Sequence, residues 1–177
     1  MKQDIKIAVS GKSGCGNTTV SKIVAEQLGL RFINFTFRSL ALEKGISFNE
    51  VLKLASIDDF WDKEVDRRQV QLAREDGGCI LGSRLAIWML KEADLKVFLT
   101  ASARVRAERI VRREGGDIDE IAAFTDERDR QDRSRYIQLY NIDNDYYDFA
   151  DLIIDTENRD VDEIARMIIA EAEKTEQ

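Results

Sequence analysis

The chain has 177 residues, of which 44% are hydrophobic and 34% charged, and its formal net charge at pH 7 is −7. This length predicts one domain with a sizeable core, and the negative charge argues against a protein that binds nucleic acid non-specifically. The chain contains no histidine, and on that ground a zinc site and a histidine general base are both excluded.

The sequence features that bear on cellular location point to the cytoplasm. No apolar run approaches the length of a membrane-spanning helix, and the N-terminal residues lack the basic-then-apolar pattern of a signal peptide. The two cysteines, Cys15 and Cys79, predict free thiols in a reducing compartment rather than a disulfide framework. We therefore expect a cytoplasmic protein that has no membrane partner.

Apolar strands alternate with amphipathic helices along the chain. In chain order we predict a strand at 5–10, a helix at 18–28, a strand at 31–35, helices at 38–45, 47–56 and 58–76, a strand at 79–81, a helix at 84–91, a strand at 95–100, a helix at 101–116, one or two helices at 117–140, a strand at 149–156 and a helix at 161–174. Because the chain contains no proline, Gly, Asn, Asp and Ser must set the helix ends. The alternation predicts an α/β fold with a five-stranded parallel sheet flanked by helices.

The segment "GKSGCGNTT", residues 11–19, follows the first predicted strand and has the glycine spacing of the phosphate-binding pattern G-x-x-x-x-G-K-[ST]. The strand before it and the helix after it favour nucleotide phosphate binding over a plain glycine-rich turn. Its backbone N–H groups and the helix N-terminus would surround the phosphates of ATP, with the Thr18 hydroxyl beside Mg²⁺. The predicted ATP phosphate-binding residues are Gly11, Lys12, Ser13, Gly14, Cys15, Gly16, Asn17, Thr18 and Thr19.

Asn17 stands where the pattern has its lysine, and this residue brings no charge. The nearest cation is Lys12, so we hypothesise that Lys12 or an arginine from residues 104–135 neutralises the transferring phosphate. The alternative, that Lys12 is an ordinary solvated loop lysine, remains equally open.

Nine arginines and no lysines lie between Arg104 and Arg135, which predicts contact with a compact anion, the alternative being a helix surface covered with ion pairs. At helical spacing, Arg128, Asp132 and Arg135 share one face, which would place two cations around one carboxylate. Asp129 and Arg133 are expected to form an ordinary ion pair along the helix. A second face would carry the set Arg106, Arg109 and Arg113.

Seven segments are typical of one family: "GKSGCGNTTVSKIVAEQLGL", "FRSLALEKGIS", "DKEVDRRQVQLA", "ILGSRLAIWML", "ADLKVFLTASARVRAERIVRREG", "ERDRQDRSRY" and "DLIIDT". Over nearly the whole chain they resemble the cytidylate kinase family of P-loop nucleoside monophosphate kinases, in its short archaeal-type branch. The resemblance implies a single P-loop domain over residues 1–177 in three layers, with acceptor-binding helices at about 34–76 and an arginine-rich lid at about 113–127. It also implies phosphoryl transfer from ATP to CMP or dCMP with Mg²⁺, by a monomer whose partners are small-molecule nucleotides.

The same resemblance implies roles for single residues. Arg38 and Arg84 would bind the acceptor phosphate, and Asp66 and Arg67 would lie near the acceptor base. The full acceptor-binding set is Arg38, Asp66, Arg67, Ser83, Arg84, Arg128 and Asp132. With Lys12 added from the loop, the catalytic set is Lys12, Arg109, Arg113 and Arg135, and the metal-side residue is Thr18.

Two positions depart from the family pattern. Residues 34–37 read "NFTF" where a Gly-Asp pair is usual, and Gly82 follows the third predicted strand where an acidic residue is common. These departures, together with Asn17, leave two other functions open. One is a related P-loop kinase with another acceptor, such as AMP, UMP or a non-nucleotide, and the other is a regulatory module that binds nucleotide without turnover.

Overall fold

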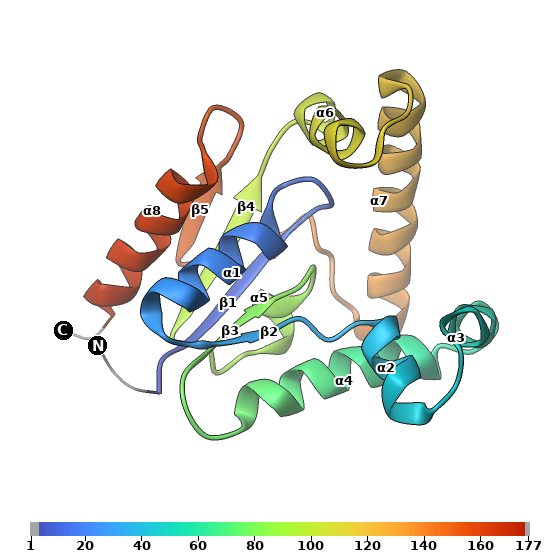
Figure 1. The fold of residues 1–177 in the computed structure, drawn as a ribbon, viewed down its shortest axis with the longest axis horizontal. Coiled ribbons are helices and arrows are strands. Elements are labelled where there is room, and N and C mark those ends of the chain that lie inside the picture. The colour runs from blue at the N-terminus through green and yellow to red at the C-terminus, as the bar shows by residue number, and fades with distance from the viewer. Residues whose placement is uncertain (1–3, 176–177) are drawn as a thin grey trace.

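Five parallel strands form the centre of the molecule, in the order β2-β3-β1-β4-β5 (Figure 1). The structure is a computed structural model that describes residues 4–175. The strands are β1 (Lys6–Gly11), β2 (Arg31–Ile33), β3 (Cys79–Gly82), β4 (Leu95–Thr100) and β5 (Leu152–Asp155). Both β3 and β4 pair with β1, so β1 ends at the middle of the carboxyl edge of the sheet. The predicted five-stranded parallel sheet is confirmed.

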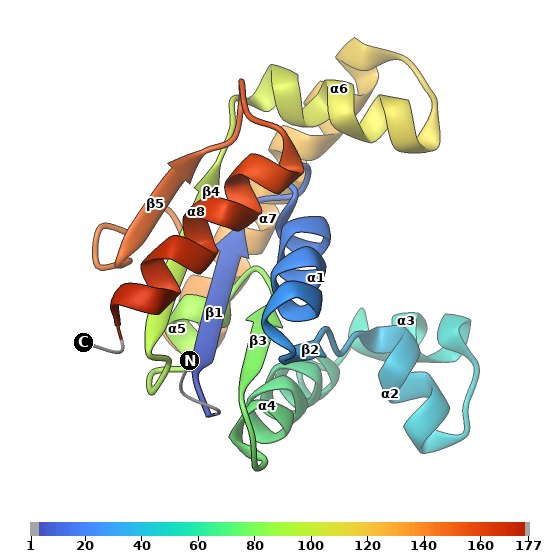
Figure 2. The same ribbon diagram turned by 60° about the vertical axis from the view of Figure 1, so that its left-hand side comes forward.

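Helices cover both faces of this sheet. They are α1 (Asn17–Leu28), α2 (Phe37–Lys44), α3 (Phe48–Ala55), α4 (Phe60–Arg74), α5 (Ala86–Met89), α6 (Ala103–Glu114), α7 (Ile118–Tyr140) and α8 (Val161–Lys174). Figures 1 and 2 show α1 and α8 side by side on one face, with α5 behind the sheet. The α2–α3 pair projects at one end of the molecule, whereas the corner between α6 and α7 projects at the other (Figure 2). These two projections are the segments predicted as acceptor-binding helices and lid.

The core forms on both faces of β1 because successive side chains of a strand point to opposite sides. Ile7 and Val9 are buried with residues of α1 and α8, whereas Ala8 is buried in the cluster that includes α5. In that second cluster Trp88 meets Phe98 edge-to-face, with ring centroids 5.9 Å apart. Because both faces of the sheet are buried, the sequences of the strands are apolar almost throughout.

Glycine, asparagine and acidic or hydroxyl residues set the helix ends, as the absence of proline predicted. Gly29 and Gly45 adopt left-handed conformations directly after α1 and α2, and Asn141 does so after α7. The side chains of Ser102 and Asp117 accept hydrogen bonds from the first-turn N–H groups of α6 and α7. Residues 118–140, for which one or two helices were possible, form one helix of 23 residues. Within residues 4–175, no helix has the length and apolar character that a bilayer crossing requires.

Candidate active site

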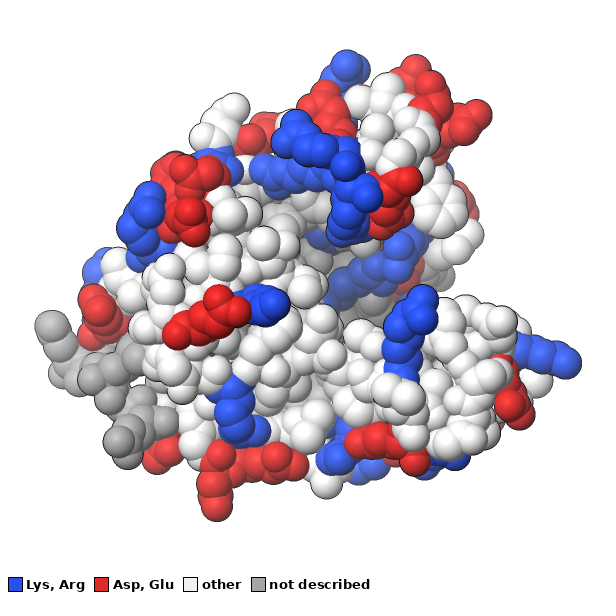
Figure 3. Space-filling view, viewed as in Figure 1, with Lys and Arg blue, Asp and Glu red and all other residues white. Residues whose placement is uncertain are grey.

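A cavity of about 1440 Å³ lies at the carboxyl edge of the sheet. Its lining comes from the loop 11–19, from the segment 34–37 and helices α3 and α4, and from α6 and α7. Figure 3 shows Lys and Arg side chains at the rim and in the depth of this hollow. Small-molecule pockets usually measure about 300–1,000 Å³, so this cavity has room for more than one nucleotide-sized ligand.

The loop between β1 and α1 has the conformation of a phosphate cradle. Gly14 and Gly16 have φ angles of 87° and 92°, which residues with a side chain rarely adopt. No side chain caps the first turn of α1, and no acidic residue lies in that turn. The free N–H groups and the positive end of the helix dipole therefore face the cavity, an arrangement that suits an anion.

Asn17, the first residue of α1, lies between the loop and β3. Its Oδ1 accepts a hydrogen bond of 3.2 Å from Ser21 Oγ. A Cβ atom at Gly82 would come within 2.9 Å of Ser21 Oγ and 3.3 Å of Asn17 Oδ1. Asn17, which departs from the phosphate-loop pattern, and Gly82, which departs from the family pattern, are thus neighbours, and a side chain at residue 82 would crowd the packing of α1 on the end of β3.

Two arginines of α6 donate hydrogen bonds to backbone carbonyl groups of the loop. Arg106 Nη1 donates to the Ser13 carbonyl at 3.2 Å, and Arg109 Nη1 donates to the Gly14 carbonyl at 3.3 Å and to Thr156 Oγ1 at 2.9 Å. The backbone of α6 lies so close to Gly14 that a Cβ there would be 2.8 Å from the Arg106 carbonyl oxygen. Arg109 lines the cavity, whereas Arg106 is 4% exposed and lies behind the lining.

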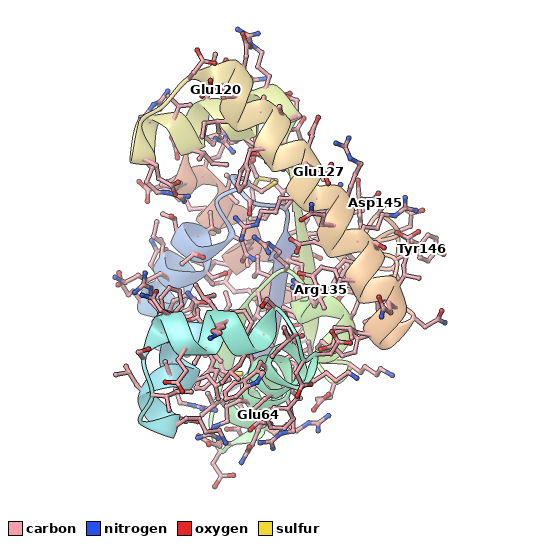
Figure 4. All side chains as sticks on the ribbon, turned by 90° about the vertical axis from the view of Figure 1, so that its right-hand side faces the viewer. Glu64, Glu120, Glu127, Arg135, Asp145 and Tyr146 are labelled. Carbon is pink, nitrogen blue, oxygen red and sulfur yellow. The ribbon has the colours of Figure 1, made fainter. Side chains whose placement is uncertain are left out.

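A charged network joins the end of β3 to α7. Arg84 contacts Asp132 through Nη1 at 2.7 Å and donates through Nη2 to Ser13 Oγ at 2.8 Å. Arg135 contacts the other oxygen of Asp132 at 3.1 Å and reaches Asp62 of α4 at 3.1 Å. Figure 4 shows Arg135 between α7 and the helices α3 and α4. The predicted pair of cations around Asp132 exists, but Arg84 takes the place expected for Arg128.

Arg128 lies one turn before Asp132 and lines the same cavity. Burial lowers its pKa, and the nearby Arg84 guanidinium lowers it further. Like-charge repulsion of this kind is relieved when an anion binds between the two side chains. Arg84, Arg128 and Arg135 therefore make one positive region that faces the loop.

Asp66 of α4 lines the cavity on the side opposite the loop. Burial raises the pKa of its carboxyl group to about 6, although the hydrogen bond of 2.7 Å from the Tyr140 hydroxyl lowers it in part. Burial also raises the pKa of Tyr140. A carboxyl group that titrates near neutral pH in a cavity is a candidate for ligand contact.

Lys12 lines the cavity and forms an ion pair with Asp145, with Nζ and Oδ1 2.7 Å apart. Asp145 lies in the segment after α7, and Arg133 of α7 also contacts it, at 3.4 Å. About a third of the Lys12 side chain is exposed.

The loop also supplies an oxygen ligand that suits Mg²⁺. Thr18, in the first turn of α1, is exposed and lines the cavity. Among residues 4–175, no cluster of three acidic, cysteine or histidine residues could hold a metal ion alone. Mg²⁺ at nucleotide sites usually binds through substrate phosphates and one or two protein oxygens. The Thr18 hydroxyl fits an ion that arrives with a nucleotide.

Comparison with known proteins decides the family. The sequence profile of the Cytidylate kinase-like family matches residues 6–158. The chain belongs to that family.

Curated relatives of this cytidylate kinase-like chain extend over nearly its full length. A protein named Cytidylate kinase 2 from Borreliella afzelii is 46% identical over 96% of this chain and 97% of its own. The Cytidylate kinase of Pyrococcus horikoshii is 46% identical over 88% of this chain and 81% of its own, and that of Archaeoglobus fulgidus is 37% identical over 96% and 95%. Archaeal proteins are thus among the relatives, as the resemblance implied.

Solved structures confirm the P-loop kinase fold. Shikimate kinase from Bacteroides thetaiotaomicron superimposes with a TM-score of 0.64 at 18% identity, covering 96% of this chain and 98% of the other. The deoxyadenosine kinase of M. mycoides with bound dATP gives 0.58 at 14% identity, covering 96% and 100%. These distant likenesses show the arrangement of the chain only.

Two predicted site residues of this cytidylate kinase-like chain do not line the cavity. Arg67 pairs with Glu64 on the outer face of α4, and Arg38 is exposed with its guanidinium over the Phe48 ring at 4.1 Å. Neither belongs to the lining, whereas Ser83, Arg84, Arg128 and Asp132 do. Arg113 lines the cavity at the end of α6, where its exposed side chain contacts Glu114.

The expected ion pair between Asp129 and Arg133 is wrong. Asp129 pairs with Arg106 of α6 at 2.8 Å, and Arg133 pairs with Asp143 at 2.6 Å. Each side chain finds its partner on a neighbouring segment because α7 packs against α6 and against the chain that follows it. Cys15, predicted among the phosphate-binding residues, is 2% exposed, and burial raises the pKa of its thiol.

Sequence reasoning missed two residues of the site. Gln69, buried on α4, lines the cavity, and its spacing of three from Asp66 was the one signal that could have found it. Asp145, the partner of Lys12, lies in a polar segment far along the chain, and no local pattern links the two.

Proposed function

We propose that this protein transfers the γ-phosphoryl group of ATP to CMP or dCMP, forming ADP and CDP or dCDP. The cytidylate kinase-like family and its named relatives support the reaction. The observation that carries the proposal is the convergence of Arg84, Arg128 and Arg135 on the cavity that the phosphate loop also lines. Three guanidinium groups opposite a helix N-terminus suit a site where several phosphates meet.

In this proposal ATP binds on the loop side and the acceptor on the side of α3 and α4. The N–H groups of residues 11–19 would hold the donor phosphates. Arg84, Arg128 and Arg135 would attract the acceptor phosphate and stabilise the charge on the transferring group, with Asp132 holding two of them in place. Lys12, Arg109 and Arg113 would contact the donor phosphates from the loop and from the lid side.

The residue types fit this reaction because phosphoryl transfer depends mainly on positioning and charge stabilisation. The attacking atom is already a phosphate oxygen, so no general base is required. When bound, Mg²⁺ would neutralise charge across the donor phosphates, and Thr18 would be its protein ligand. Arg38 and Arg67 have no part in this proposal because they lie outside the cavity lining.

A panel of acceptors tests the proposal directly. The purified full chain would be mixed with ATP, Mg²⁺ and one of CMP, dCMP, UMP or AMP, and ADP release and the nucleotide product would be measured. We expect the highest kcat/KM for CMP or dCMP. A higher value for another acceptor would assign a related kinase instead, and thermal stabilisation by ATP and CMP without ADP formation would indicate a module that binds without turnover.

Matched variants connect the activity to the positive region. Arg135→Ala is expected to lower kcat/KM by about 10- to 100-fold, because a charge-assisted contact to phosphate contributes about 1.5–3 kcal/mol. Arg104→Ala is the control, since Arg104 lies exposed on α6 and its ion pair within residues 4–175 is with Glu108 of the same helix. Equal activity of the two variants would show that the Arg135 guanidinium group does not contribute to catalysis. A monomer remains our expectation, which gel filtration would test.

A further inference from the structure

The carboxamide oxygen of Gln69 is buried without a hydrogen-bond partner. The residue is 6% exposed, and no donor within residues 4–175 reaches its Oε1 atom. Buried polar atoms of folded proteins nearly always have a partner, so an exception needs a physical reason. Because Gln69 lines the large cavity, a ligand group can supply the missing donor.

Asp66 adds a second hydrogen-bond acceptor beside this oxygen. Asp66 and Gln69 are three residues apart on α4, which places them on the same face of the helix, and both line the cavity. One carboxylate oxygen of Asp66, Oδ2, accepts a hydrogen bond of 2.7 Å from the Tyr140 hydroxyl. The cavity face of α4 therefore presents acceptors, and it suits a ligand group that has N–H donors.

Beside Val65 and Gln69 the cavity lining is largely apolar and aromatic. Phe35 and Val65 belong to one buried cluster and line the cavity, as do Phe48 and Leu52 of α3. Apolar walls with a few convergent polar groups are typical of a pocket for a flat heterocycle. Arg84 and Arg128 lie at the end of β3 and on α7, and Arg135 of α7 reaches α4 at Asp62, so the side of the cavity lined by Phe35, Val65 and Gln69 is left for the base.

We propose that Gln69 selects the base of the acceptor nucleotide. Its Oε1 atom would accept a hydrogen bond from one N–H of an exocyclic amino group, and the second N–H of that group would donate to Asp66. The inference rests on the proposed function and deepens it. Cytosine has an amino group where uracil has a carbonyl oxygen. With uracil, Oε1 stays unpaired and acceptors face each other, so the subsite selects cytidine over uridine monophosphate.

The test compares CMP and UMP in three forms of the full chain. Wild type, Gln69→Leu and the control Gln71→Leu would be assayed for kcat/KM with each acceptor at one fixed, saturating ATP concentration. Gln71 is on the same helix but exposed and outside the lining, where it accepts a hydrogen bond from Arg67. We expect Gln69→Leu to lower the CMP-to-UMP ratio by about 10- to 100-fold, and Gln71→Leu to leave it unchanged.

Thermal unfolding distinguishes recognition from a structural role. Gln69→Leu removes an oxygen that has no protein partner to lose, so the free variant should melt no lower than wild type, while the stabilisation by CMP should fall. A variant that fails to fold, an unchanged ratio, or a loss of UMP turnover alone would each overturn the proposal.

The two proposals can fail separately. If wild type phosphorylated no nucleotide, the proposed function would fail, and the inference would be judged by thermal shift with CMP and UMP. Preferential stabilisation by CMP that Gln69→Leu abolishes would then still support it, and equal shifts would overturn it. If wild type prefers CMP and Gln69→Leu keeps that preference, only the inference fails.

Discussion

Arg106 on α6 and Asp129 on α7 form an ion pair of 2.8 Å in which the two side chains are only 5% and 12% exposed. Arg106 also donates to the Ser13 carbonyl of the phosphate loop. The pair therefore connects α6 and α7 with each other and with the loop. Removing one partner of such a pair leaves a buried charge without its counter-charge, and this lowers the stability of the folded state because the surroundings have a low dielectric constant.

Asp129→Ala is accordingly expected to lower the free energy of unfolding by about 3–5 kcal/mol. Glu127→Ala is the matched control on the same helix, because Glu127 pairs with Arg130 and both side chains are more than half exposed. An exposed pair contributes about 0–1 kcal/mol. Urea unfolding would measure both values, and equal losses in the two variants would show that burial does not decide the contribution of this pair.

Asp66 predicts a pH dependence of stability. Burial raises the pKa of its carboxyl group from 3.8 to about 6, so the folded chain holds this proton more tightly than the unfolded chain. The stability that this group contributes is complete below about pH 4 and is lost as pH rises through about 6, a change of about 3 kcal/mol. The Asp66→Asn variant should lack this loss of stability. Its free energy of unfolding relative to that of wild type should therefore rise from pH 4 to pH 7. Urea unfolding of both proteins across that range would measure it.

Tyr140→Phe provides the control for this titration. The Tyr140 hydroxyl lowers the pKa of Asp66 because it donates to the carboxylate. Without the hydroxyl the pKa rises further, so the fall in stability should extend to higher pH. A profile identical to that of wild type would show that the hydrogen bond does not affect the titration.

Gly82 and Ser21 explain one departure from the family pattern in terms of packing. A Cβ at position 82 would lie 2.9 Å from Ser21 Oγ and 3.1 Å from Ser21 Cβ, so α1 or β3 would have to move. Gly82→Ala is expected to destabilise the fold by about 1–3 kcal/mol, the usual cost of overpacking. In a double-mutant cycle with Ser21→Gly, the double variant should lose less stability than the sum of the single variants. Additive losses would indicate that the two positions do not interact.

Features set by adjacent residues could be predicted from the sequence, and features set by distant residues could not. The strand β4 was predicted at the residues where it lies, and so was the glycine loop from Gly11 to Gly16, because apolar runs and glycine spacing are local signals. Charge partners depend on how α6 and α7 pack. Asp129 was therefore assigned to Arg133 of its own helix, although its partner is Arg106. The burial of Gln69 likewise depends on segments far from α4 in the chain.

Lys12 tests how the loop compensates for Asn17. Its ion pair with Asp145 is partly exposed, with side chains 31% and 42% accessible, so Lys12→Ala should change the free energy of unfolding by less than about 1 kcal/mol. If Lys12 contacts the donor phosphates, the same variant should lower kcat/KM for ATP by about 10- to 100-fold. Lys22→Ala is the control, because Lys22 is exposed on α1 and outside the cavity lining.

Asp145→Asn separates the cation from its partner. This variant weakens the ion pair but keeps the ammonium group, so turnover should remain at least as high as in wild type while Lys12→Ala stays impaired. If both variants keep full kcat/KM for ATP, Lys12 is a solvated loop residue. Arg109, which lines the cavity and contacts the loop at the Gly14 carbonyl, would then be the cation to test as a replacement for the lysine that position 17 lacks.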